Sequence, residues 1–102
     1  MTEGHVMLEL SPDTIERIHA LLPESQWSAA ENLLLNHTVF ERMTAPDWSE
    51  LAERVRFAVL KLSGGNLDAL SHQLDEAKID WRDTLMAAGF GHETSAHKNW
   101  KP

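Results

Sequence analysis

Apolar residues recur every three or four positions along most of this chain, which is the spacing of one face of an α-helix. The clearest stripe ends at Leu62, and its members are Trp48, Leu51, Ala52, Val55, Val59 and Leu62. Asp47, three residues before Glu50, gives a start that resembles a capping box, and Gly64-Gly65 allows a left-handed end. We therefore predict a helix over 48–62 around which the rest of the chain is organised.

Two helices are predicted before this one. Ser11-Pro12-Asp13 is a typical helix start, because serine caps, proline fits the first position and an acid suits the first turn. Pro23 closes that helix. The next helix begins at Ser25 or Ser28 and runs to about Met43, with an apolar stripe of Ala30, Leu33, His37 and Phe40.

Two more helices are predicted after the glycine pair. Asn66 is placed to cap a helix whose stripe is Leu67, Leu70, Leu74 and Ala77. Asp80 begins another short helix, Trp81 and Leu85 face inward, and Gly89 ends it.

The two ends of the chain are predicted to be less regular. Residues 1–10 alternate between apolar and polar side chains, and no second strand signal follows. We expect an extended arm that lies on the core or pairs with the same arm of a second copy. Residues 91–102 form a tail with room for a short helix, with Ala96 and Trp100 on one side. The whole pattern predicts one all-α domain over 1–102, a compact bundle of five or six short helices.

Composition narrows the functional classes. The chain has 102 residues, of which 42% are hydrophobic and 25% charged, as in ordinary globular domains. It has no cysteine, no apolar run that approaches the length of a membrane span, and no signal-peptide pattern at its start. We expect a cytoplasmic protein that does not enter membranes.

The net charge of −7 disfavours binding to nucleic acids, because a surface that binds nucleic acid is basic. The charge is unevenly distributed: residues 1–53 carry ten acidic and two basic side chains, and residues 54–102 carry six acidic and seven basic ones. Such asymmetry is either a chance property of a solvated surface or a feature that orients a head-to-tail contact.

One histidine pair nearly matches a zinc-protease signature. His92-Glu93 is followed by His97, but the signature places its histidines four residues apart, so that both face one metal. A spacing of five turns the two rings about 140° apart on a helix. We read this segment as a polar tail.

A second candidate is a set of four carboxylates, Glu50, Glu53, Asp80 and Asp83. Paired acidic motifs on two helices are similar to those of all-α nucleotide pyrophosphatases, which hold magnesium through oxygen ligands. Glu50 and Glu53 lie opposite the apolar stripe, however, so a solvated face is the competing interpretation.

A third candidate is a metal or ligand site at His19 and His37, each of which lies within an apolar stripe. With Glu16 and Glu41, these side chains would give two histidines and two carboxylates between the first two helices. Di-iron bundles need two Glu-x-x-His steps, and this chain has one. The competing interpretation places both histidines at the edge of the core, hydrogen-bonded to backbone or carboxylate.

Phe57 and Leu60 lie on a second face of the 48–62 helix. They are either covered by the first two helices or form a self-association patch. The sequence leaves both possibilities open, with some preference for the core.

The segment from Asp80-Trp81-Arg82-Asp83 to Ala87-Ala88-Gly89-Phe90 resembles the C-terminal part of small bacterial helical proteins of unknown function. The resemblance implies a bacterial, cytoplasmic, helical protein and adds nothing about chemistry. The leading hypothesis is a non-enzymatic protein-interaction or regulatory module that forms a homodimer or binds another protein. No catalytic, cofactor-binding or metal-binding residue is assigned, and the two alternatives are the metal-dependent hydrolase and the histidine-centred bundle.

Overall fold

A computed structural model describes residues 10–37, 48–91 and 96–102. Within these ranges it contains four α-helices, which are α1 (Pro12–Leu21), α2 (Trp27–His37), α3 (Trp48–Ser63) and α4 (Leu67–Ala88). Two 3-10 turns, η1 (Glu24–Gln26) and η2 (Ala96–Asn99), complete the described part of the chain. The all-α prediction is confirmed for these residues, but they form four α-helices instead of five or six.

The helix boundaries follow the local signals. The Ser11 side chain accepts a hydrogen bond from the Thr14 backbone N–H at 3.1 Å, and Asn66 accepts one from Ala69 N–H at 2.8 Å. Both are side-chain caps of otherwise unpaired amides at a helix start. Gly64, Gly65 and Gly89 have positive φ values of 61°, 86° and 82° where α3 and α4 end. The predicted caps at Ser11, Asn66 and Gly89 are therefore confirmed.

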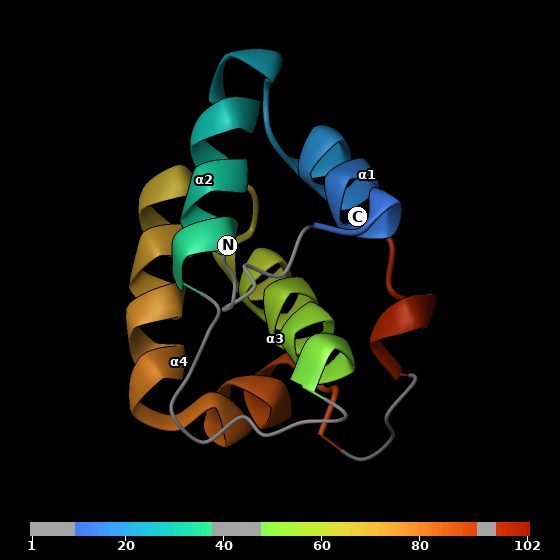
Figure 1. Cartoon of the computed structure of the whole chain (residues 1–102), viewed down its shortest axis with the longest axis vertical. Coiled ribbons are helices and arrows are strands. Elements are labelled where there is room, and N and C mark those ends of the chain that lie inside the picture. Colours follow the sequence, from blue (N-terminus) through green and yellow to red (C-terminus); the bar gives the residue numbers. More distant parts are fainter. Residues whose placement is uncertain (1–9, 38–47, 92–95) are drawn as a thin grey trace, which may run out of the picture.

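Helix α3 lies in the middle of the molecule (Figure 1) and packs against α4, α1 and η2. Helix α2 contacts α4 and α1. All six residues from Val55 to Leu60 are buried, which places protein around the whole circumference of α3. The hydrophobic core extends from this helix to the stripe predicted for α4, in which Leu70, Leu74 and Ala77 are at most 1% exposed.

Two cations of α3 hold the far end of α4. Lys61 Nζ donates to Ala88 O at 2.8 Å, and Arg54 Nη2 donates to Phe90 O at 2.7 Å. Carbonyl groups at a helix C-terminus have no partner inside the helix, and positive charge there also interacts favourably with the helix dipole. The predicted short helix after Asp80 is thus docked onto α3, although it continues α4 without an intervening loop.

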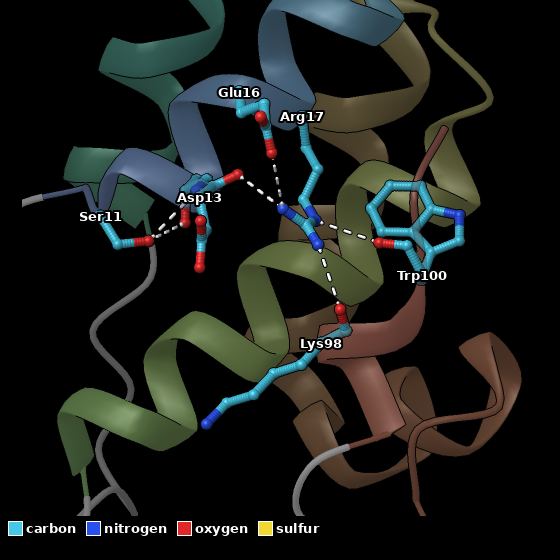
Figure 2. Close-up of polar contacts among 7 residues, drawn as sticks. Ser11, Asp13, Glu16, Arg17, Lys98 and Trp100 are labelled. Atoms are coloured by element: carbon cyan, nitrogen blue, oxygen red, sulfur yellow. Dashed lines mark hydrogen bonds and ion pairs between the residues drawn. The ribbon is translucent and has the colours of Figure 1, made fainter.

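The C-terminal segment lies beside α1 and α3 and contacts a residue more than 80 positions earlier in the chain. Arg17 Nε donates to Trp100 O at 3.1 Å, and its Nη2 donates to Lys98 O at 3.3 Å. Figure 2 shows the Arg17 guanidinium reaching from α1 toward these two carbonyl groups, with Nη1 donating to Asp13 O. Ala96 and Trp100, which were predicted to lie on one side of the tail, both pack against the core.

Two sequence predictions, the N-terminal arm and the end of the second helix, fall partly outside the described residues. The extended arm is described only at Leu10, which packs against the core. The end of the second helix, predicted near Met43, lies beyond His37, the last described residue of α2. None of the helices in the described ranges combines the length and the apolar character that crossing a membrane requires.

Candidate functional site

Helix α4 bends at Asp80, and this bend forms the candidate site. Asp80 has extended backbone angles (φ −154°, ψ 92°) inside an otherwise helical segment. Its Oδ1 accepts hydrogen bonds from Arg82 N–H at 3.1 Å and Asp83 N–H at 3.4 Å. Aspartate therefore acts as the N-cap of the second half of the helix. Figure 1 shows α4 running down one side of the molecule and then turning beneath α3.

A groove of about 260 Å³ follows the bend, and all of its lining residues belong to α4. They recur at helical spacing on both sides of Asp80, and the lining consists of His72, Gln73, Glu76, Ile79, Asp80, Asp83, Thr84 and Ala87. A straight helix presents a convex surface, so the hollow is a direct result of the capped bend. We call this surface the α4 groove.

The α4 groove combines an apolar side chain with acidic neighbours. Ile79 is 81% exposed, the most exposed large hydrophobic residue in the described part of the chain. Three lining residues, Glu76, Asp80 and Asp83, are acidic, and none of the described residues that line the groove is a lysine or arginine. The α4 groove thus places one exposed apolar side chain beside three exposed carboxylates.

The four carboxylates proposed for magnesium are not brought together. Glu53 Oε2 lies 3.5 Å from His97 Nε2, while Asp80 and Asp83 line the α4 groove. Among the described residues, which include all four, no group of three or more metal-ligating side chains is arranged to hold an ion. The hydrolase hypothesis therefore gains no support from the geometry.

The Glu53 carboxylate instead faces two buried bases. Burial lowers the pKa of Arg56 to about 10, and Glu53 opposes this shift. Burial also lowers the pKa of His97, and Glu53 again acts in the opposite direction. At neutral pH the arginine is thus charged and the histidine neutral.

His19 and His37 have separate partners. The His19 ring stacks on Trp27 with centroids 3.7 Å apart, and its Nε2 lies 3.9 Å from Glu31 Oε2. His37 Nδ1 lies 2.8 Å from Lys78 Nζ on α4.

The carboxylates proposed to join these histidines do not complete a site in the described structure. Glu16 lies 3.5 Å from Arg17 Nη1, and Glu41 lies outside the described residues. His19 is exposed and His37 half-buried, and their different partners give no support to a metal centre.

The self-association patch predicted at Phe57 and Leu60 does not exist as an exposed surface. Phe57 is 1% exposed and Leu60 is fully buried. The Phe57 ring contacts the Arg17 guanidinium at 4.3 Å and the rings of His97 and Trp100. The core interpretation of this face is confirmed, and the cover comes from α1 and the C-terminal segment.

A second hollow of about 460 Å³ lies between α2 and α4. Most of its lining surface is apolar, with Leu33 and Leu67 half-buried and Asp68 as the one acidic residue among the described lining residues. It carries no charge pattern that selects a ligand class. The α4 groove has the more specific chemistry.

Sequence reasoning missed two features. Ile79 lies off the apolar stripe formed by Leu67, Leu70, Leu74 and Ala77. Its position on the helix therefore predicts a side chain that faces outward. His97 was assigned to a polar tail but is fully buried, and the ring contacts that bury it join distant segments of the chain.

No family model, curated protein or solved structure matches this chain significantly.

Proposed function

We propose that this protein is a non-enzymatic interaction module that binds a basic segment of another protein in the α4 groove. The observation that supports the proposal is the 81% exposure of Ile79 within a lining whose described residues include three acidic side chains and no lysine or arginine. The partner chemistry follows from the groove: one large apolar side chain to cover Ile79, flanked by lysine or arginine.

Each part of the groove has a separate role in this proposal. Covering an isoleucine removes apolar surface from water and contributes about 1.5–3 kcal/mol. The exposed carboxylates accelerate encounter with a basic partner more than they strengthen the complex. A groove along one face of a helix suits a single helical or extended segment, which can place one apolar anchor between charged residues.

The charge of the chain favours a different protein over a second copy. Two-fold related copies would present the same Glu76 and Asp83 to each other, and the net charge of −7 adds to the repulsion. The predicted homodimer remains a prediction, which the experiment below distinguishes from binding to a basic partner.

The test uses synthetic 12-residue peptides titrated into the full chain by isothermal calorimetry. One peptide carries lysines and a single central leucine, the second replaces that leucine with serine, and the third replaces the lysines with glutamates. We expect measurable binding by the first peptide only. Backbone chemical-shift changes should lie along 72–87 of α4.

Two matched pairs of variants identify the groove as the binding surface. Ile79→Glu should weaken the peptide at least tenfold, whereas Met86→Glu, at a residue that is 55% exposed but outside the groove, should not. Glu76→Lys should weaken it more than Asp75→Lys, which changes the net charge equally at an adjacent exposed residue outside the groove.

Either of two outcomes would overturn the proposal. Equal losses within each pair would show that the groove is not the binding surface. A dimer seen by native mass spectrometry, lost in Ile79→Glu, would replace the basic partner with a second copy of the chain.

A further inference from the structure

His97 is fully buried between two aromatic rings. Its ring centroid lies 5.1 Å from that of Phe57 and 6.3 Å from that of Phe90, both in edge-to-face orientation. Within the described structure neither ring nitrogen makes a hydrogen bond, and the 3.5 Å from Nε2 to Glu53 Oε2 is an ion-pair distance. This site accommodates a neutral imidazole as an apolar ring.

Other described residues of the segment also contact the bundle. Arg17 holds it through the carbonyl groups of Lys98 and Trp100, as Figure 2 shows. Trp100 also packs beside Phe57 and Phe90 with ring centroids 6.3 Å from each, and Ala96 packs against the core. The docked segment thus holds the His97 ring out of water, in the middle of its contacts with the bundle.

We propose that the C-terminal segment 96–102 is a pH-sensitive latch, docked while the His97 imidazole is neutral and released when the ring takes up a proton. Release would uncover the rings of Phe57 and Phe90. The proposal concerns a different surface from the α4 groove and does not depend on it.

The charges around His97 act in opposite directions. Glu53 on α3 favours a charged ring, whereas Arg54 on α3 and Lys98 on η2 oppose it. The guanidinium of Arg17 on α1 lies on the Phe57 ring that borders the site and adds positive charge to the same region. Burial is the largest effect. Burial, Arg54 and Lys98 together outweigh Glu53, so the pKa of the docked His97 lies below 6.5.

The direction of the pH effect follows from this shift. A released His97 ionises near its ordinary pKa of about 6.5, while the docked ring binds a proton only at lower pH. Between these two values the released state binds more protons than the docked state, so lowering the pH favours release. Docking is strongest above pH 6.5 and weakens as the pH falls below it.

The Trp100 backbone amide reports docking, because its hydrogen bond to His97 O at 3.1 Å closes a short turn inside the segment, and such a turn is not protected from exchange once it leaves the bundle. Its hydrogen-exchange protection factor in the full chain, measured by NMR, should fall as the pH is lowered from 7.5 to 5.0. The Leu70 amide, which donates to Asn66 O in α4, serves as the internal reference and should stay protected.

Two variants test the role of the imidazole. His97→Phe keeps an aromatic ring between Phe57 and Phe90 but cannot ionise, so Trp100 protection should no longer depend on pH. Glu53→Gln removes the carboxylate that favours the charged ring, so protection at pH 5.0 should fall further than in the unaltered chain. The second variant provides the test if the first does not fold.

The proposal fails if Trp100 protection is the same at both pH values in the unaltered chain. It also fails if protection decreases equally in His97→Phe, or if Glu53→Gln reduces or leaves unchanged the loss at pH 5.0. A His97 ring that titrates at 6.5 while Trp100 stays protected would likewise overturn it.

Discussion

Helices α3 and α4 share the largest interface of the bundle, but their other surfaces differ. Residues 55–60 of α3 are buried without interruption, while α4 buries the stripe of Leu70, Leu74 and Ala77 and leaves Ile79 in solvent. A helix that is covered all round contributes stability and offers no binding surface. The helix with the clearest sequence pattern is therefore the scaffold, and the bent helix beside it carries the candidate site.

The two helices should differ most in how much the truncation of one side chain lowers the free energy of unfolding. Phe57→Ala removes a ring that contacts Arg17, His97 and Trp100, and it should lower the free energy of unfolding by about 3–5 kcal/mol. Ile79→Ala should change it by less than about 0.5 kcal/mol, because the side chain is already in water. Urea unfolding followed by circular dichroism measures both values. Similar losses in the two variants would contradict the assignment of scaffold and site.

A smaller loss of stability is expected when Arg17 is replaced, because this residue holds the C-terminal segment against α1 and α3. Arg17 is 4% exposed and donates to three carbonyl groups, so Arg17→Met should lower the free energy of unfolding by about 2–3 kcal/mol. Arg17→Lys is the control, because an ammonium keeps the charge but lacks the planar set of donors. We expect lysine to recover only part of the loss in thermal unfolding experiments. Full recovery would mean that charge alone holds the tail.

Losses smaller than that of Arg17→Met are expected at the joint between α3 and α4. A side chain at Gly65 would need a φ of 86° and would place its Cβ 2.8 Å from Leu21 O, so Gly65→Ala should cost about 2 kcal/mol. Gly64 has a φ of 61° with nothing near its Cβ position, so Gly64→Ala should cost about 1 kcal/mol. Melting temperatures of the two variants test this order. A reversed order would show that contact with α1 does not restrict the joint.

The sequence predicted those parts of the fold that depend on neighbouring residues. Ser11, Asn66 and Gly89 act as helix caps where expected, and the α3 stripe is buried at Ala52, Val55 and Val59. These outcomes depend on hydrogen bonds and side-chain spacing within one or two turns.

The parts that were not predicted depend on contacts between distant residues. Arg17 is buried because Lys98 and Trp100 supply carbonyl acceptors 81 and 83 positions later, and nothing near Arg17 signals this. The sequence predicted the cap at Asp80. It did not predict that α4 continues through Asp80 without a loop, and the groove forms because of this. That continuity depends on how the two halves of α4 pack against the rest of the bundle. Phe57 was ambiguous for the same reason, since its cover comes from α1 and the C-terminal segment.

The long sequence separation between Arg17 and the tail also has a consequence for the order of folding. Closing a loop of more than 80 residues costs conformational entropy that only a few tail contacts repay, whereas α3 and α4 are adjacent in sequence. We expect the tail to dock after the transition state, so Arg17 and Trp100 should have φ-values near zero. Substitutions at the latch would then accelerate unfolding and leave the refolding rate almost unchanged. The segment that joins last in folding is therefore also the one whose contacts set how long the folded protein persists.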